Sequence, residues 1–207
     1  MCIRDSMNIA LIGLGSMGYN LAKNMVSKNY HVNAFEKNML IVENIKNDNI
    51  QNLYLLNSIQ DLVDKTPSPR IIMLSLPADK IDKCINDLID HLNPTDIIAD
   101  LGNSLYLKSM EREKLLSRFN ISFLGIGVSG GPRGAKNGPA IMAGGSKSAW
   151  EKVKNIFEDI SAKNDNESAC CYFGSSGSGH FVKLVHNGSE YALREGLAEI
   201  SNLLEVA

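Results

Sequence analysis

The stretch "NIALIGLGSMG", residues 8–18, decides the fold. An apolar run typical of a buried strand leads into Gly13, Gly15 and Gly18, which have the GxGxxG spacing, and a helical pattern follows. In this motif the first glycine permits a tight turn, the second lets the backbone approach a pyrophosphate, and the third lets the helix pack close to the strand. The free N–H groups at the start of the helix suit phosphate oxygens. The stretch therefore predicts a dinucleotide site, with a purely structural glycine turn as the alternative.

Beyond this unit, short apolar runs continue to alternate with longer amphipathic stretches. Strands are predicted at residues 31–35, 70–76, 96–100, 121–128 and 139–145. Helical patterns cover residues 146–160 and 175–207, and a glycine-rich loop separates the last two strands. Strands that are apolar on both sides suit a sheet with helices on both faces. The predicted fold class is therefore α/β, a Rossmann-like doubly wound and mostly parallel sheet followed by a long helix.

The composition narrows the classes of function. The 207 residues carry a formal net charge of -2, which gives no field to attract nucleic acid or an anionic membrane. The four cysteines show no metal-ligand spacing, so we expect reduced thiols and no metal. No apolar run reaches the roughly 18 residues of a membrane-spanning helix, and the N-terminus lacks the pattern of a secretion signal. We expect a soluble, cytoplasmic protein that binds neither nucleic acid nor membrane.

The chain is expected to divide into three parts. Residues 1–6, "MCIRDS", precede a second methionine at which the first strand pattern begins, so we expect them to be a non-native leader. Residues 7–176 are expected to form an NAD(P)-binding domain. Residues 177–207 are expected to begin a longer helix, because the helical pattern ends without a capping glycine or proline. Intact-mass analysis of the natural protein that finds residues 1–6 would refute the first expectation.

The end of the second predicted strand bears on the choice of dinucleotide. Glu36 lies about 20 residues after the glycine motif, where a carboxylate accepts the ribose 2′-hydroxyl of NAD and repels the 2′-phosphate of NADP. Lys37 beside it can instead pair with that phosphate. The two neighbours argue in opposite directions, and a solvated charge pair at a strand end is a third interpretation. The expected cofactor is therefore NADP or NAD.

The last helical stretch carries polar side chains at three- and four-residue intervals, which places them on one face. They are His180, Lys183, Asn187, Glu190, Tyr191 and Arg194. A lysine and a glutamate two turns apart can act as base and acid on a small polyol. Desolvation beside a bound cofactor would lower the pKa of the lysine enough for it to take a proton from a hydroxyl. The alternative is an ordinary solvated helix face.

Two loops that follow predicted strands add candidate ligands. Asn103 and Ser104 come directly after a strand, and ligands of open α/β sheets bind at the carboxyl ends of strands. Ser129, Gly130 and Gly131 follow the next strand and can present backbone N–H groups to a carboxylate. Glycines at such a place can also serve only a long turn. These loops nevertheless favour a binding site over a solvated helix face.

Four stretches together carry a family resemblance: "IALIGLGSMG", "DLGNSLY", "GVSGGPRGAKNGPAIMAGG" and "SGHFVKLVHNGSEY". They resemble 6-phosphogluconate dehydrogenases over nearly everything after Met7, and the last stretch is the most specific. The resemblance implies oxidation of 6-phosphogluconate at C3, with hydride transfer to NADP or NAD. Loss of carbon dioxide then gives ribulose 5-phosphate, a step of the pentose phosphate pathway. A lysine supplies the polarising charge, so no metal is expected.

The resemblance also implies a role for each matched residue. Lys183 matches the general base, which takes the C3 hydroxyl proton, and Glu190 matches the acid that protonates C1 of the enediol. The positions matched to substrate binding are Asn103, Ser129, Gly130, Gly131, His186, Asn187 and Tyr191, the last toward the phosphate. The positions matched to cofactor binding are Gly13, Gly15, Ser16, Met17, Gly18, Glu36, Lys37, Asn38, Leu76, Pro77, Ala78 and Asn103.

The chain departs from the family pattern in several places. Glu36, Lys37 and Asn38 stand where the family usually has Asn-Arg-Thr, so Glu36 argues for NAD although the family usually takes NADP. The turn formed by residues 76–78 looks more like that of 3-hydroxyisobutyrate-type dehydrogenases. Three further departures are Leu101, Pro132 and Arg133. None of them falls on the predicted acid and base.

Family members carry a large all-helical second domain, which the resemblance implies would follow residues 177–207. We therefore expect a homodimer when the protein is complete, and little or no turnover from the chain alone. Two other functions stay open. One is an NAD-dependent 3-hydroxyacid dehydrogenase of the 3-hydroxyisobutyrate type, and the other is a nucleotide-binding module without catalysis.

Overall fold

The structure is a computed structural model and describes residues 8–165 and 167–206, so the expectation for residues 1–6 lies outside it. Within the described residues, one sheet has eight strands in the order β10-β7-β6-β5-β4-β1-β2-β3. They are β1 (Asn8–Ile12), β2 (Val32–Phe35), β3 (Leu53–Leu56), β4 (Arg70–Leu74), β5 (Ile97–Asp100), β6 (Ser122–Ser129), β7 (Ala140–Gly145) and β10 (Cys170–Tyr172). Strands β8 (Lys163–Asn164) and β9 (Glu167–Ser168) pair separately.

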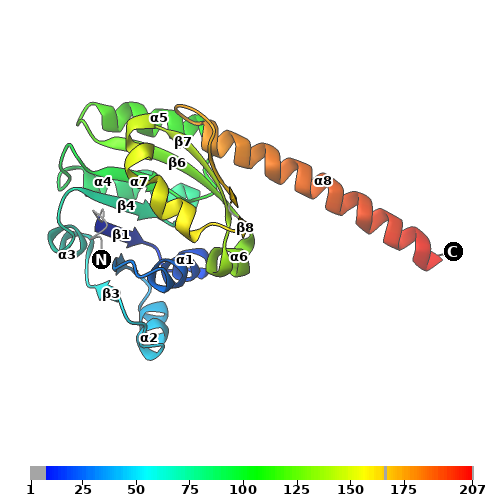
Figure 1. Cartoon of the computed structure of the whole chain (residues 1–207), viewed down its shortest axis with the longest axis horizontal. Coiled ribbons are helices and arrows are strands. Elements are labelled where there is room, and N and C mark those ends of the chain that lie inside the picture. Colours follow the sequence, from blue (N-terminus) through cyan, green and yellow to red (C-terminus); the bar gives the residue numbers. More distant parts are fainter. Residues whose placement is uncertain (1–7, 166, 207) are drawn as a thin grey trace.

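Helices cover both faces of this sheet (Figure 1). They are α1 (Ser16–Ser27), α2 (Met39–Asn47), α3 (Ile59–Lys65), α4 (Ala78–Ile89), α5 (Tyr106–Ser117), α6 (Gly131–Asn137), α7 (Lys147–Ile160) and α8 (Ser178–Val206). Apolar side chains of α1, α6 and α7 form the core on one face, and those of α3, α4 and α5 form the core on the other. The predicted doubly wound α/β fold is therefore confirmed.

The predicted strands and the two predicted helices are all present. The apolar periodicity does not predict β3 or β10, because both strands are short and neither contains a buried residue. The glycine-rich stretch expected to be a loop instead contains the short helix α6, which is a correction. Strand β7 runs antiparallel to β6. An eight-residue strand spans about 26 Å, and a seven-residue helix of about 10 Å cannot return the chain to its start.

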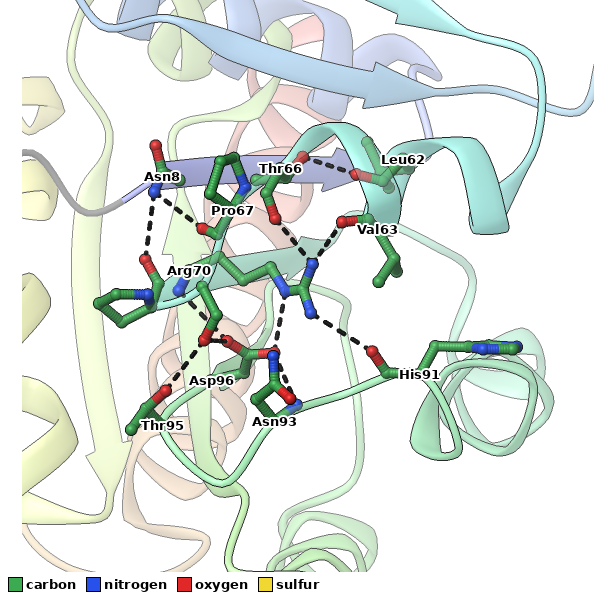
Figure 2. A network of polar contacts seen from close by, with 12 residues as sticks. Asn8, Leu62, Val63, Thr66, Pro67, Arg70, His91, Asn93, Thr95 and Asp96 are labelled. Carbon is green, nitrogen blue, oxygen red and sulfur yellow. Dashed lines mark hydrogen bonds and ion pairs between the residues drawn. The ribbon is translucent and has the colours of Figure 1, made fainter.

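A buried ion pair lies at the end of the sheet where β4 begins (Figure 2). The glycine motif lies at the opposite ends of the strands. Nε of Arg70 donates to Oδ2 of Asp96 at 2.8 Å, and the two side chains are 4% and 0% exposed. Asp96 also accepts hydrogen bonds from the Ser68 hydroxyl and the Asn93 backbone N–H. The other guanidinium N–H groups donate to the backbone carbonyls of Val63, Thr66 and His91. The pair therefore ties α3, β4 and the end of α4 together.

The first turns of α8 lie directly on β6 and β7 because glycines stand where the strands meet the helix. A Cβ atom added at Gly127 would lie 2.6 Å from Cβ of Lys183, and one at Gly144 would lie 2.3 Å from the backbone nitrogen of Gly179. Such distances are too short for any side chain. Farther along, α8 leaves the sheet and runs away from the body (Figure 1), and every residue from 191 to 205 is exposed. The glycines therefore set the height of Lys183 above the sheet.

Candidate active site

A cavity of about 1070 Å³ opens at the carboxyl ends of β1, β4, β5 and β6, and α8 forms one of its walls. Most residues predicted to form the site come together here. They are Gly15, Ser16, Met17, Gly18, Leu76, Pro77, Ala78, Asn103, Ser129, Gly130, Gly131, Lys183, His186, Asn187 and Glu190. Ligands of doubly wound folds bind at the carboxyl ends of the strands. The cavity thus joins the predicted cofactor loop to the predicted acid and base.

The glycine loop has the shape that a pyrophosphate needs. Gly13 has a φ of +93°, and a Cβ added there would lie 2.4 Å from the carbonyl oxygen of Ser75. A Cβ at Gly18 would lie 1.9 Å from the carbonyl oxygen of Gly13, whereas Gly15 faces open space. Gly15 is also the N-cap of α1 and makes no side-chain cap, so the first N–H groups of the helix are available to an anion. The loop therefore fits the diphosphate of a dinucleotide.

The different surroundings of Gly13 and Gly15 lead to opposite predictions. We expect Gly13→Ala to destabilise the fold by about 1–3 kcal/mol, because alanine is strained at this φ and meets backbone. We expect Gly15→Ala, at a φ of -61°, to keep the melting temperature and to weaken dinucleotide binding by about tenfold or more. Thermal unfolding and dinucleotide titration of both variants test this. Equal losses of stability in the two variants would contradict it.

Glu36 is held by one backbone N–H group of the glycine loop and by one of the segment between β2 and α2. Its Oε2 accepts the N–H of Leu14 at 2.7 Å, and its Oε1 accepts the N–H of Asn38 at 2.8 Å. Glu36, Lys37 and Gly13 line a second cavity of about 320 Å³ beside the main one. Asn38 caps α2 by accepting the backbone N–H of Leu40. The Glu36 carboxylate is therefore fixed before any ligand arrives, next to a lysine that can meet a phosphate.

Lys183 sits on the wall of the main cavity above Gly127. Burial lowers the pKa of its amine, and the nearby Glu190 carboxylate opposes that shift. Desolvation favours the neutral amine, which is the form that accepts a proton. One turn farther on, Nδ2 of Asn187 lies 3.4 Å from Oδ1 of Asn103, so α8 meets the loop after β5. The arrangement can position a hydroxyl-bearing ligand and remove a proton from it.

Glu190 lies between Arg194 and His186 on α8. Nη2 of Arg194 lies 2.5 Å from its Oε1, and Nδ1 of His186 lies 3.9 Å from its Oε2. Arg194 also lines the cavity. The sequence places Arg194 on the polar face but predicts no role for it, because a surface arginine four residues after a glutamate is also what an ordinary helical ion pair looks like. The predicted acid therefore has an ion-pair partner that the motif does not reveal.

Two residues of the predicted polar face lie away from the cavity. Tyr191 is 68% exposed and does not line it. His180, in the first turn of α8, is 2% exposed, and its Nδ1 is 2.6 Å from the Ser109 hydroxyl. A Cβ atom on Gly125 of β6 would lie 3.0 Å from this Nδ1, so the glycine makes room for the ring. His180 therefore serves the packing of α8 on the sheet, which corrects the expectation that it shares the ligand-facing side.

A buried polar cluster supports the loop that carries Asn103. Oδ1 of Asp100 accepts the N–H of Gly102 at 2.9 Å, and Oδ2 accepts the Ser104 hydroxyl at 2.7 Å. Arg112 of α5 pairs with the same Oδ2 at 2.8 Å. Ser104, which the sequence marks as a candidate ligand, is buried and donates to Asp100. The cluster fixes the loop from below and leaves the amide of Asn103 to face the cavity.

His180 should make stability depend on pH. Burial is the largest cause that lowers its pKa in the folded chain, and the Asp100 carboxylate opposes it. The unfolded chain then binds the proton more readily than the folded chain. The contribution of His180 to the free energy of unfolding is therefore fully present above about pH 6.5 and is lost as the pH falls below that value. The slope for one proton is at most about 1.4 kcal/mol per pH unit. Urea unfolding between about pH 7.5 and 5.5 should show a smaller slope for His180→Gln than for the wild type.

The control variant for this measurement is His31→Gln, since His31 is exposed. It should keep the wild-type slope. A wild-type slope in His180→Gln would refute the assignment to His180.

The described residues contain no helix both long and apolar enough to cross a membrane. In the same ranges, no group of three or more His, Cys, Asp or Glu side chains is arranged to hold a metal ion.

Comparison with known proteins gives one family model, described as the NAD binding domain of 6-phosphogluconate dehydrogenase, which matches residues 8–174. A decarboxylating 6-phosphogluconate dehydrogenase of Buchnera aphidicola subsp. Acyrthosiphon pisum (strain APS) is 41% identical over 199 residues, 95% of this chain and 42% of that protein. The corresponding Caenorhabditis elegans protein is 40% identical over 203 residues, 97% of this chain and 42% of that protein. The chain thus spans about two fifths of the length of these relatives.

Comparison with solved structures also finds a 6-phosphogluconate dehydrogenase. Plasmodium falciparum 6-phosphogluconate dehydrogenase, solved in its apo form, with NADP+ and with 6-phosphogluconate, superposes with a TM-score of 0.85 at 36% identity. That match covers 89% of this chain and 40% of the Plasmodium chain. A Mycobacterium tuberculosis 3-hydroxyisobutyrate dehydrogenase superposes with a TM-score of 0.81 at 21% identity, over 94% of this chain and 64% of that one. The second likeness concerns the fold alone.

Proposed function

Because this chain belongs to the family of the NAD binding domain of 6-phosphogluconate dehydrogenase, we propose that the complete protein oxidatively decarboxylates 6-phosphogluconate with NADP or NAD. The observation that carries the proposal is the position of Lys183. Its side chain, with a lowered pKa, lines the same cavity as the glycine loop and the Ser129–Gly131 turn. A base, an acid and a dinucleotide loop around one cavity are the parts that this reaction needs.

In this proposal the nicotinamide supplies the hydride acceptor. Neutral Lys183 takes the proton of the C3 hydroxyl as the hydride leaves C3, which makes the ketone. The resulting ammonium then returns a proton to the ketone oxygen while the bond from C2 to the carboxyl carbon breaks and carbon dioxide leaves. Glu190 finally gives a proton to C1 of the enediol, which is the former C2, while Lys183, neutral again, takes the proton of the enol hydroxyl, and ribulose 5-phosphate results. Asn103 and Asn187, which approach each other across the cavity, are placed to orient the hydroxyl groups.

Each part of the chain has a place in this function. We assign dinucleotide binding to residues 7–176 and treat residues 177–207 as the start of a helix that connects to a further domain. We also propose that the complete protein is a cytoplasmic homodimer. Support for the further domain and the homodimer comes from the outer half of α8, where Leu197, Ile200, Leu203 and Leu204 are 55–74% exposed and would be covered by further protein.

The test is cofactor reduction on addition of 6-phosphogluconate to the complete protein, with NAD and NADP in parallel. Substrate-dependent reduction is expected, and residues 7–207 alone should turn over poorly. A preference for NAD would show that Glu36 governs the ribose site, and a preference for NADP would assign it to Lys37. No reduction with either cofactor from a folded protein would reject the proposal.

A second candidate is an NAD-dependent 3-hydroxyacid dehydrogenase. Two features favour it: the turn Leu76–Ala78, which lines the main cavity, and Glu36, which lines the smaller one. This candidate needs a hydride acceptor and a base, but it gives Glu190 no proton to deliver. Reduction of NAD by an unphosphorylated 3-hydroxyacid such as 3-hydroxyisobutyrate, without reduction by 6-phosphogluconate, would select it. A chain that binds dinucleotide and reduces it with neither substrate would be a non-catalytic module.

A further inference from the structure

We propose that Arg112 is a positioning residue for hydride transfer. Its guanidinium holds two segments of the cavity wall at a fixed separation, the β4 turn (residues 75–78) and the β5 loop (residues 101–104). The inference rests on the proposed function, because it takes a dinucleotide as the ligand and hydride transfer as the reaction. Arg112 lies on α5, is 4% exposed and does not line the cavity. It therefore acts on a ligand through the two segments and not by contact.

The guanidinium of Arg112 binds both segments from behind the cavity wall. Toward α4, Nη2 donates to the carbonyl oxygen of Ala78 at 3.4 Å, and Nε donates to Oδ1 of Asp82 at 2.6 Å. Toward the β5 loop, Nη1 donates to Oδ2 of Asp100 and to the Ser104 hydroxyl oxygen, both at 2.8 Å. A guanidinium is planar, so its N–H groups have fixed directions. The two segments bound to it therefore keep a fixed separation.

The two segments lie between the glycine loop and the predicted base. The strand order β6-β5-β4-β1 places the β4 turn beside the glycine loop and the β5 loop beside that turn. Both segments line the cavity, and Asn103 approaches Asn187, one turn after Lys183 on α8. They also contact each other closely, since a Cβ atom added at Gly102 would lie 2.8 Å from the carbonyl oxygen of Leu76. A ligand that extends from the glycine loop toward Lys183 therefore passes both segments.

Hydride transfer makes this separation important for the rate. The reacting atoms must come within about 3–3.5 Å in the correct orientation, and a misplacement of about 1 Å can lower the rate by about 10²-fold. The Asp100 carboxylate by itself balances the charge of Arg112. The further bonds to Ala78 and Asp82 are the ones that connect the β5 loop to the β4 turn.

Arg70 offers a matched comparison within the same sheet. Its side chain is 4% exposed and its partner Asp96 is 0% exposed, the same values as for Arg112 and Asp100. The Arg70 network lies at the end of the sheet where β4 begins (Figure 2), and none of its partners lines the main cavity. A purely structural role predicts the same behaviour for both arginines, whereas a positioning role separates them.

The experiment compares Arg112→Lys with Arg70→Lys in the complete protein. Lysine keeps a positive charge beside the buried aspartate, but its single nitrogen cannot bind both segments. We expect both variants to lower the melting temperature, and only Arg112→Lys to lower kcat for 6-phosphogluconate, by about 10- to 100-fold. Calorimetric affinity for ADP should stay within about twofold of the wild type in both variants, because Arg112 does not contact the glycine loop.

A second pair of variants leaves the buried ion pair intact. The Asp82 side chain is 54% exposed, so Asp82→Ala should fold while it removes one of the two bonds from Arg112 to α4. We expect kcat to fall by about 3- to 10-fold. Asp82→Asn keeps an Oδ1 acceptor for Nε and should restore most of the loss. A wild-type kcat in folded Arg112→Lys, or equal losses of kcat in Arg112→Lys and Arg70→Lys, would overturn the proposal.

Hydrogen exchange without any ligand gives a readout that does not depend on the reaction. The N–H of Gly102 donates to Oδ1 of Asp100 at 2.9 Å, so the β5 loop and the β4 turn should exchange faster in Arg112→Lys and not in Arg70→Lys. Unchanged exchange in Arg112→Lys would show that the positioning role is wrong, while the proposed function stands. If the wild type does not oxidise 6-phosphogluconate but exchange changes as expected, the proposed function fails, and the connection of the two segments by Arg112 stands.

Discussion

We expect replacement of Lys183 by methionine to lower turnover of the complete protein by about 10²-fold or more and to leave dinucleotide affinity nearly unchanged. The amine is the basic group next to the cavity whose pKa is lowered by burial, and methionine keeps its length without its proton chemistry. Dinucleotide affinity depends on the glycine loop, which belongs to a different part of the cavity wall. A variant that keeps wild-type turnover would show that Lys183 is not the base.

The pH dependence gives this prediction a second readout. A base acts in its neutral form, so kcat/KM should rise with pH through the pKa of Lys183 and level off above it. Because burial lowers that pKa, the rise should occur below pH 10.4, the ordinary value for lysine. Lys152→Met, which removes an exposed lysine from α7, should leave both turnover and the pH profile unchanged. An unchanged profile in a residually active Lys183→Met variant would contradict the assignment.

Replacing Asp96 by alanine should destabilise the fold by about 3–5 kcal/mol, because it leaves the Arg70 guanidinium charged and buried without its partner. Asp96 also accepts hydrogen bonds from Ser68 and Asn93, so the loop before β5 loses its anchor as well. The free energy of unfolding in urea measures the effect. A loss this large is a major part of the 5–15 kcal/mol that holds a typical domain together.

Two controls test whether burial is the reason. Asp87→Ala breaks the exposed Lys83–Asp87 pair and should change stability by less than about 1 kcal/mol. The double variant Arg70→Met with Asp96→Leu removes both charges and should recover part of the loss, since a buried pair can be replaced by apolar side chains. A loss in Asp96→Ala no larger than in Asp87→Ala would show that the buried network contributes little.

The central sheet could be predicted from the sequence because its signals are local. The glycine motif predicts β1 and α1, and apolar runs predict the strands that helices cover on both faces. The edge strands could not be predicted, since β3 and β10 bury little and carry no strong period. Nor does any local signal state that β7 is antiparallel. That follows from the length of α6 compared with the length of β6.

The candidate site was predictable where spacing alone places residues together. The helical intervals bring Lys183, Asn187 and Glu190 to one wall, and all three line the cavity. The burial of His180 was not predictable, because it depends on Gly125 and Ser109, which belong to elements far away in the sequence. One signal was present and carries information: "FLGIGV" in β6 has glycines at alternate positions, which put bare backbone on one face of the strand.

The way α8 leaves the sheet divides the helix into two cooperative units. Amide protons of its first turns, packed on β6 and β7, should exchange with solvent only when the sheet opens. Those of residues 191–205 lie in fully solvated turns, held only by continuation of the helix, and should exchange orders of magnitude faster through fraying. Lys183 belongs to the first unit, and Glu190 stands at the border. In this chain by itself, the base is therefore as rigid as the sheet, whereas the acid is only as rigid as a solvated helix.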